Sequence, residues 1–369
     1  MVDPARRFAC CVLPPGQSGP RLGLLALVLA TFGAVHWLRE ARPSSGPYVT
    51  AVTGDAATIC RVDRGRILSK RLTGLRPGTV VHARAPGGKG GEVVFRTARP
   101  PGEGFTFCVV GDTGLSTNRP GRDTLDVQHA LAAALARAAP DFVVHLGDLA
   151  YYDGDQDQIV AQFFEPFADP LARCAWFFTP GNHDVRDGAG SAYFALFPSD
   201  GPDPRFYSFD WGDVHFVSLD ASDNTLPDDH PQYAWLERDL AAVPPGRARV
   251  VLQHTPIYST GCKGPNVQTL GRPLLPLLKR HGVALLLAGH DHSYERTQPI
   301  DGTAYVVSGG GGARLYPRFP AADWTAASAI RHHFLKLTVA TGGASLELEA
   351  IDVGRTVFDR ATITLHPTP

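Results

Sequence analysis

Five short segments of the chain place metal-binding side chains directly after runs of apolar residues. They are Gly111-Asp112-Thr113-Gly114, Gly147-Asp148-Leu149-Ala150-Tyr151, Gly181-Asn182-His183-Asp184, Val251-Leu252-Gln253-His254 and Gly289-His290-Asp291-His292. Carboxylate, phenol, amide and imidazole groups together suit a pair of hard to borderline cations better than one soft ion, and no Cys-x-x-Cys motif accompanies them. The sequence therefore predicts a dinuclear metal centre that is rich in oxygen ligands.

The apolar runs before these motifs are typical of buried strands. They occupy residues 105–110, 142–146, 175–179, 249–253 and 284–288. Helical patterns at 124–139 and 232–243, with a weaker one at 270–281, alternate with the strands, as expected for helices that cover a sheet. Because loops gather at the carboxyl ends of such strands, the five motifs are expected to meet in one crevice.

Further strand-like segments lie outside these five runs. They lie at 206–209 and 214–219, which form a hairpin-like pair, and at 334–339, 345–351 and 357–365. We therefore expect an α/β (α+β) domain of two facing sheets flanked by helices, in which the late strands complete the second sheet.

The five motifs, in this order, resemble those of the metallophosphoesterases and, within them, of the purple acid phosphatases. Most metallophosphoesterases open with Asp-x-His, whereas here Gly114 stands two residues after Asp112, and Tyr151 follows Asp148 by three. The resemblance covers the chain from Phe105 onward. It implies a calcineurin-like metallophosphoesterase fold, a two-sheet β-sandwich flanked by helices, for residues 99–369.

The resemblance also implies a set of ligands. The iron, Fe(III), would be held by Asp112, Asp148, Tyr151 and His292, and a divalent ion (zinc, manganese or iron) by Asp148, Asn182, His254 and His290. Asp148 would bridge the two ions, and the phenolate of Tyr151 would colour the protein by charge transfer to iron. Two such ions would allow a metal-bound hydroxide to cleave a phosphate monoester directly, without a covalent phosphoenzyme.

Three residues are expected to contact the substrate. Asn182 and His183 would face the phosphate, and His183 could stabilise the transition state or protonate the leaving oxygen, so we expect it to carry any proton transfer. A second histidine often lies nine residues beyond the ligand that corresponds to His254, but this chain has Lys263 there. An ammonium binds a phosphate oxygen as a point charge and is a poor proton donor in acid, so we expect Lys263 to bind substrate.

Other polar residues near the motifs have simpler interpretations. His145 and His215 lie inside strand-like runs and are expected in the core, whereas His332 and His333 are expected at the surface. Asp184, Asp291 and Tyr294 stand beside presumed ligands and could orient them. Cys60 and Cys262 could pair in an oxidising compartment, although no disulfide framework is indicated.

Charge and alternatives bound the function. The chain has 35 Lys and Arg against 36 Asp and Glu, and no basic helix or nucleic-acid motif appears, so nucleic acid is not an expected partner. The resemblance implies a phosphoester small molecule or a phosphoprotein as substrate. A phosphodiesterase or nucleotide pyrophosphatase of the same superfamily is the main alternative. A non-catalytic envelope-binding protein with structural metals is the alternative from another class.

The N-terminal part predicts export. Residues 1–21 would be cytoplasmic, and 22–38 form an uncharged apolar run that would act as a membrane anchor or a signal peptide. Residues 39–47 read as a linker. Residues 48–98 contain short alternating segments and resemble a fibronectin type III module, although they are too few for a full sandwich. The catalytic domain would then lie outside the cytoplasm, tethered or, after cleavage, secreted.

Overall fold

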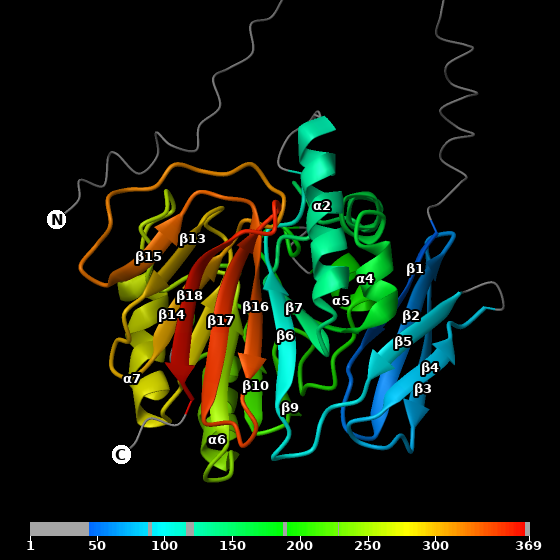
Figure 1. The fold of residues 1–369 in the computed structure, drawn as a ribbon, viewed down its shortest axis with the longest axis horizontal. Helices are drawn as coiled ribbons and strands as arrows, with labels where there is room; N and C mark the ends of the chain where they lie inside the picture. The colour runs from blue at the N-terminus through cyan, green and yellow to red at the C-terminus, as the bar shows by residue number, and fades with distance from the viewer. Residues whose placement is uncertain (1–43, 88–90, 116–121, 187–189, 228, 366–369) are drawn as a thin grey trace, which may run out of the picture.

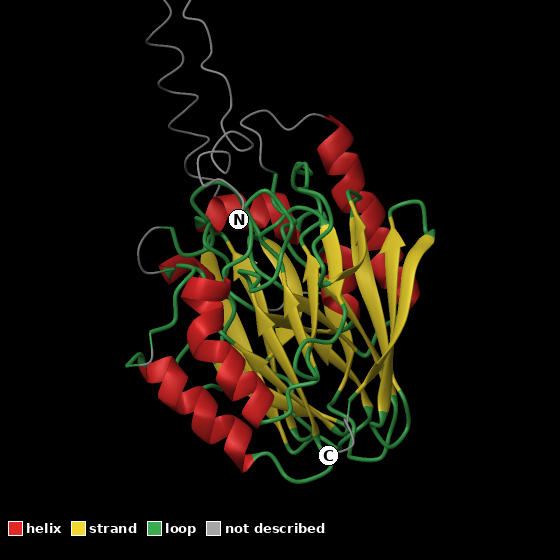
Figure 2. Cartoon of the chain, turned by 90° about the vertical axis from the view of Figure 1, so that its left-hand side faces the viewer, coloured by secondary structure: helices red, strands yellow, loops and turns green. Residues whose placement is uncertain are grey.

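Two β-sheets lie face to face in the computed structural model, and helices cover the outer side of each (Figures 1 and 2). The structure describes residues 44–87, 91–115, 122–186, 190–227 and 229–365. The layers therefore run helices, sheet, sheet, helices, as the sequence predicts.

The first sheet has nine strands and contains both ends of the described chain. In spatial order they are β18 (Val357–Thr364), β17 (Ser345–Asp352), β16 (His333–Val339), β6 (Phe105–Val110), β7 (Phe142–His145), β8 (Ala175–Phe178), β1 (Ser45–Thr50), β2 (Ala56–Asp63) and β3 (Arg66–Thr73). Strands β6, β7 and β8 are mutually parallel, so their carboxyl ends meet at one edge.

The second sheet has seven strands. In spatial order they are β15 (Thr325–Ala329), β13 (Tyr294–Thr297), β14 (Ala304–Ser308), β12 (Leu285–Ala288), β11 (Ala248–Gln253), β10 (Val214–Ser218) and β9 (Tyr207–Trp211). Strands β10, β11, β12 and β14 are parallel. Strands β9 and β10 pair antiparallel through the turn between them, as the hairpin-like pattern predicts.

Aromatic side chains from both sheets fill the space between them. Phe107 and Phe142 of the first sheet stack with ring centroids 5.1 Å apart, and Phe142 lies 4.6 Å from the ring of Trp211 in the second sheet. Phe216 packs edge-on against Phe107 at 5.3 Å. Burial of each such side chain stabilises the fold by roughly 1.5–3 kcal/mol, so this core fixes the distance between the two sheets.

The helices form two outer layers. Helices α2 (Arg122–Ala138), α3 (Gln156–Ile159), α4 (Ala168–Arg173) and α5 (Ser191–Leu196), with the π-helical turn η2 (Val160–Phe164), pack on the first sheet. Helices α6 (Pro231–Ala242) and α7 (Arg272–Arg280), with the π-helical turn η3 (Val267–Gly271), pack on the second. The start of α6 is fixed locally, because His230 Nδ1 accepts from the backbone N–H of Gln232 at 3.2 Å and Pro231 occupies the first turn.

Strands β1, β2 and β3 are part of the first sheet, so the N-terminal segment does not form a freestanding sandwich. Strand β1 pairs with β8 in parallel through Val49 and Ala175, and β2 and β3 follow at the edge (blue, at the right of Figure 1). Strands β4 (Val80–Arg84) and β5 (Glu92–Arg96) form a separate two-stranded sheet. Since β1 begins at Ser45, the last residues of the predicted linker 39–47 are strand.

The predicted cytoplasmic segment 1–21, the apolar run 22–38 and the linker up to residue 43 lie outside the described residues. Within the described ranges, no helix combines the length and apolar character needed to cross a membrane.

The prediction that the late strands complete the second sheet is wrong. Strands β16, β17 and β18 extend the first sheet, with β16 antiparallel to β6. Without β16, β6 would present an unpaired edge. The alternate residues Leu335, Leu337 and Val339 of β16 bury their side chains in the core between the sheets.

Candidate metal centre

The five predicted motifs meet at the carboxyl ends of parallel strands from both sheets. Asp112, Asp148 and Asn182 follow β6, β7 and β8 of the first sheet, whereas His254 and His290 follow β11 and β12 of the second. The centre therefore lies where the two sheets face each other, and it requires both.

One group of side chains gathers around His254. Donor atoms of Asp148, His254 and His290 all lie within 4.8 Å of one another. His254 Nε2 is 3.4 Å from Asp148 Oδ2, 3.1 Å from His290 Nδ1 and 3.2 Å from Asn182 Oδ1. These are the four residues predicted to hold the divalent ion.

A second group gathers around the hydroxyl of Tyr151. This oxygen lies 2.9 Å from His292 Nε2 and 3.3 Å from Asp112 Oδ1, and the latter two atoms are 3.4 Å apart. Asp148 also interacts with the Tyr151 hydroxyl, so its carboxylate touches both groups. The structure thus brings together all seven predicted ligands, with Asp148 in the shared place.

Hydrogen bonds to the backbone orient two of the imidazoles. His254 Nδ1 donates to the carbonyl of Leu146 at 2.7 Å, and His292 Nδ1 donates to that of Arg314 at 2.7 Å. Each ring therefore turns its Nε2 toward the centre, which is the nitrogen a metal ion would bind. The ring of Tyr316 stacks on His292 with centroids 4.2 Å apart and an interplanar angle of 13°.

The backbone bends sharply at the candidate ligands themselves. Asp112, Asp148 and His290 have φ values of 59°, 57° and 70°, in the left-handed region that costs a non-glycine residue about 1–2 kcal/mol. Gly181, which precedes the predicted ligand Asn182, allows the backbone after β8 to lie against the side chain of Asp148. A Cβ there would lie 2.2 Å from Asp148 Oδ1, which no real contact allows.

The charges at the centre fit cations. Asp112 and Asp148 are 0% and 2% exposed. Carboxylates that are buried in this way need positively charged partners. Burial disfavours a charged His254, but Asp148 and Asp112 outweigh burial and raise the pKa of His254 to about 10. Burial, with Asp148 and Asp112, raises the pKa of Tyr151 well above its usual value near 10. A phenolate at Tyr151 therefore requires added positive charge, and an oxygen- and nitrogen-rich set of this kind suits two hard to borderline cations.

Two of the three predicted substrate residues, His183 and Lys263, lie on different loops, after β8 and β11. His183 is half-buried, its backbone N–H donates to Asp148 Oδ1 at 2.9 Å, and its Nδ1 donates to the carbonyl of Tyr152 at 2.8 Å. Lys263 is exposed. Its backbone N–H donates at 3.0 Å to the carboxylate of Asp291, the residue between His290 and His292. Burial and the charge of His254 lower the pKa of His290 well below its usual value.

The residues expected to orient ligands differ in what they contact. The Asp184 carboxylate accepts from the backbone N–H groups of Asp148 at 2.7 Å, Leu149 at 2.9 Å and Gly181 at 2.9 Å, so it ties the loops after β7 and β8 together. Asp291 faces another loop, described below. Tyr294 donates to Asp359 at 2.5 Å and orients no predicted ligand.

Two of the histidines outside the centre, His145 and His333, are core residues. His145 is fully buried beside Thr113 Oγ1 at 2.9 Å, and burial lowers its pKa to about 3. His215 lies between two carboxylates. The prediction that His333 lies at the surface is wrong, because it is 0% exposed, with its Nδ1 donating to Arg331 O at 2.8 Å and Ser308 Oγ 3.1 Å from its Nε2. His332 is half-buried.

Two residues near the centre have no signal in the sequence. Gln162, in η2, accepts from the backbone N–H of Tyr151 at 3.0 Å and donates to its carbonyl at 2.8 Å, so it clamps that residue. Tyr316, which stacks on His292, comes from the long loop before β15. Neither follows a strand directly, and neither belongs to a motif.

The suggested Cys60–Cys262 bridge is wrong, since Cys60 is a buried free thiol in β2.

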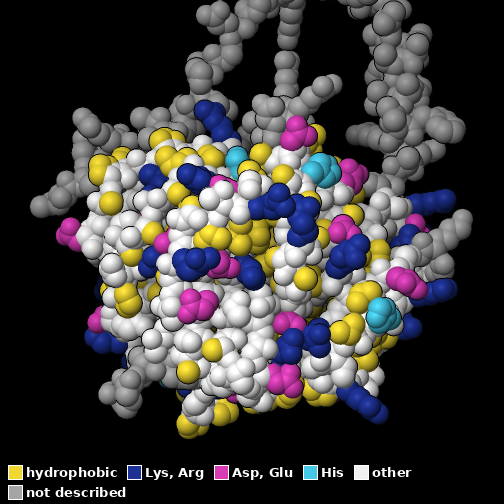
Figure 3. Space-filling view, in the orientation of Figure 1, with side chains coloured by type: hydrophobic (Ala, Val, Ile, Leu, Met, Phe, Trp, Pro, Cys, Tyr) yellow, Lys and Arg dark blue, Asp and Glu magenta, His cyan; other side chains and the backbone are white. Residues whose placement is uncertain are grey.

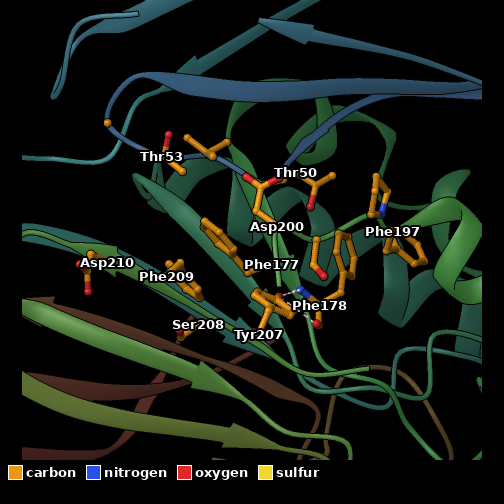
Figure 4. A pocket seen from close by; sticks show the side chains of 15 residues that line it. Thr50, Thr53, Phe177, Phe178, Phe197, Asp200, Tyr207, Ser208, Phe209 and Asp210 are labelled. Carbon is orange, nitrogen blue, oxygen red and sulfur yellow. Dashed lines mark hydrogen bonds between the residues drawn. The ribbon is translucent and has the colours of Figure 1, made fainter. Parts of the chain in front are cut away.

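A cavity of about 300 Å³ lies away from the centre, between β1, β8 and β9. Figure 4 shows its aromatic floor, which includes Phe177, Phe178, Tyr207 and Phe209. None of the nine predicted site residues lines it. It marks the junction between the N-terminal strands and the two sheets.

Surface charge offers no broad attraction for an anion on the face shown in Figure 3. Lys and Arg side chains are interspersed there with Asp and Glu.

A protein-family model, two curated sequences and one solved structure are similar to this chain. Residues 105–294 match the calcineurin-like phosphoesterase family. The chain is 30% identical to tartrate-resistant acid phosphatase type 5 of Sus scrofa over 257 residues, 61% of this chain and 74% of the relative. It is 31% identical to purple acid phosphatase 21 of Arabidopsis thaliana over 288 residues, 72% of this chain and 62% of the relative. The purple acid phosphatase PPD1 from yellow lupin seeds shares the fold, with a TM-score of 0.72, 21% identity, and coverage of 86% of this chain and 74% of that one.

Proposed function

The chain belongs to the calcineurin-like phosphoesterase family, and we propose that it is a dinuclear hydrolase of purple acid phosphatase type that cleaves phosphate monoesters. The observation that carries this proposal is the place of Tyr151. Its hydroxyl lies between Asp112 and His292, where most metallophosphoesterases would supply an imidazole from the first motif.

We propose the following ligands. Asp112, Asp148, Tyr151 and His292 would hold Fe(III), and Asp148, Asn182, His254 and His290 would hold zinc, manganese or iron. When bound, two such ions activate water at acid pH and neutralise charge on the phosphate. Fe(III) is favoured at the first position because a phenolate is a hard anionic donor, and the buried phenol of Tyr151 needs a strong positive charge to ionise.

His183 is the proposed general acid. Its Nδ1 proton is committed to the carbonyl of Tyr152, and its backbone N–H is fixed on Asp148, so the ring keeps one orientation. A ring held through Nδ1 has Nε2 left for the substrate. When the imidazole is protonated, Nε2–H can be given to the leaving oxygen, which a departing alkoxide or phenoxide requires.

Lys263 is the proposed anion-binding group. Its side chain is exposed, and its backbone N–H donates to Asp291, the residue between His290 and His292, so an ammonium on this loop can contact a phosphate oxygen from the solvent side of the centre. An ammonium donates hydrogen bonds but accepts none, and it acts as a compact point charge. Its contribution should therefore appear in substrate affinity, while proton transfer depends on His183.

The experiment that tests this function compares an aryl phosphate monoester with the matching diester. We expect the monoester to be hydrolysed with the larger kcat/KM near pH 5. A larger value for the diester would move the activity to a phosphodiesterase or nucleotide pyrophosphatase. A metal-loaded protein that cleaves neither would favour a non-catalytic envelope-binding protein.

We also propose that the protein is exported and tethered by residues 22–38. The uncharged run and the basic residues ahead of it support this orientation, with the catalytic domain outside the cytoplasm. Fractionation of cells that express the full-length chain tests it. Recovery of the protein in the cytoplasmic fraction would contradict it.

A further inference from the structure

Asp291 stands between two predicted ligands but holds a different loop. Its carboxylate accepts from the backbone N–H of Lys263 at 3.0 Å and from the hydroxyl of Ser259 at 2.5 Å. Asp291 is 1% exposed, and both of its hydrogen-bond donors lie in the segment 259–263, which follows β11. The ligand loop after β12 is thus joined directly to the loop that carries Lys263.

The shape of this loop depends on Gly261. A Cβ at this position would lie 2.2 Å from Asp291 Cγ and 2.5 Å from both carboxylate oxygens. The backbone N–H of Gly261 donates to Ser259 Oγ at 2.9 Å. The serine hydroxyl therefore bonds both to Gly261 within the loop and to Asp291 outside it. Only a residue without a side chain allows the loop to lie this close to the carboxylate.

A second anchor lies on the other side of the loop. Glu295 of β13 is 1% exposed and accepts from the backbone N–H of Thr260 at 2.6 Å and from its hydroxyl at 2.9 Å. Arg318 pairs with the same carboxylate at 3.0 Å, and the backbone N–H of Phe319 donates to the carbonyl of Thr260 at 2.8 Å. The loop is therefore fixed between β13 and the segment before β15.

We propose that Asp291 and Ser259 are positioning residues for Lys263, which hold its backbone so that the ammonium meets the phosphate beside His290. This inference rests on the proposed function of Lys263 as the anion-binding group. The side chain of Lys263 is long and exposed, and ordering it on a mobile loop would reduce the affinity it provides. Fixing the backbone removes part of that cost before the substrate binds.

Ser259→Ala tests the proposal in the full-length, metal-loaded protein. The substitution removes the hydroxyl that links Asp291 to Gly261. It alters no predicted ligand, and it leaves Asp291 itself unchanged. We expect KM for an aryl phosphate monoester to rise about tenfold, with kcat changed less than about twofold. Gly261→Ala, which forces the loop away from Asp291, should have the same effect and serves if Ser259→Ala does not fold.

A double-mutant cycle with Lys263→Ala separates positioning from a general structural effect. If Ser259 acts through Lys263, then Ser259→Ala should raise KM less than about twofold once Lys263 is alanine. An undiminished effect in that background, or an unchanged KM in Ser259→Ala alone, overturns the proposal.

Titration with inorganic phosphate gives a readout that does not require turnover. The same cycle, measured as the Kd for phosphate, should show the same loss of coupling. If the wild-type protein cleaves no phosphoester, the proposed function fails, and phosphate binding alone decides the positioning role. Equal phosphate affinity in wild type and Ser259→Ala overturns it in that case as well.

Discussion

Gly181→Ala should disable the centre while leaving the fold intact. A Cβ at residue 181 would lie 2.2 Å from Asp148 Oδ1 and 2.3 Å from its backbone nitrogen. Ordinary contacts need about 3.4 Å or more, so Asp148 and residue 181 must separate by about 1 Å. Neither atom can yield freely, because Asp148 Oδ1 accepts from His183 and the backbone nitrogen donates to Asp184.

The expected loss is large for activity and moderate for stability. A displacement of about 1 Å in a catalytic constellation lowers the rate about 100-fold, whereas overpacking costs about 1–3 kcal/mol of unfolding free energy. We therefore expect kcat/KM to fall at least about 100-fold and the metal content to drop below two ions per chain, while urea unfolding stays cooperative. The assays are hydrolysis of an aryl phosphate, elemental analysis and urea denaturation.

Gly246→Ala is the matched control. Its φ is +82°, so alanine there is strained, but nothing lies within 4 Å of the added Cβ. It should cost about 1 kcal/mol of stability and leave kcat/KM and metal content unchanged. If Gly181→Ala kept both metals and activity within about threefold of wild type, the role of close approach to Asp148 would be refuted.

Three further predictions concern single side chains. His183→Asn should lower kcat about 100-fold or more with the metal content unchanged, and a wild-type kcat would exclude it as the general acid. Lys263→Ala should raise KM about tenfold, whereas a change in kcat alone would contradict a binding role.

The third prediction concerns His215. Burial lowers the pKa of His215, but hydrogen bonds to Asp210 and Asp239 outweigh the effect of burial and raise this pKa to about 9. Because the folded pKa exceeds the unfolded value, the stabilisation is present below about pH 6.5 and is lost as the pH rises through 9. His215→Gln should thus cost roughly 2 kcal/mol in urea unfolding near pH 6 and little near pH 10, and an equal loss at both pH values would contradict the assignment.

The sequence predicted the elements of the centre because their signals are local. Each predicted ligand lies within a few residues of a buried apolar run, and such runs end where the loops of parallel strands converge. Strand β6, for example, ends at Val110 and Asp112 follows in the next turn. The meeting of the five motifs then follows from the parallel order of the strands.

Strand partners could not be predicted in the same way. Leu335, Leu337 and Val339 show that one face of β16 is buried, but both sheets face the same core, so the pattern does not say which sheet the strand joins. The partner, β6, lies more than two hundred residues earlier. Pairing over such a separation is decided by packing and leaves no short-range signal.

Side chains that reach the centre from elsewhere were also missed. Gln162 clamps the backbone of Tyr151 from a π-helical turn, and Tyr316 stacks on His292 from a long loop. His333 was expected at the surface, at the opening of a late strand, but β16 begins at His333 and buries its side chain. Ser308 and the carbonyl of Arg331 satisfy the ring there, which makes burial of a neutral imidazole acceptable.

The most direct test of the dinuclear centre is elemental analysis of the purified full-length protein together with its visible spectrum. We expect iron and a second metal in about equal amounts, two ions per chain, and an absorption band that is lost in Tyr151→Phe but kept in Tyr152→Phe. A colourless protein that contains only divalent metal, or a band that survives Tyr151→Phe, would contradict the assignment of Tyr151 as an iron ligand.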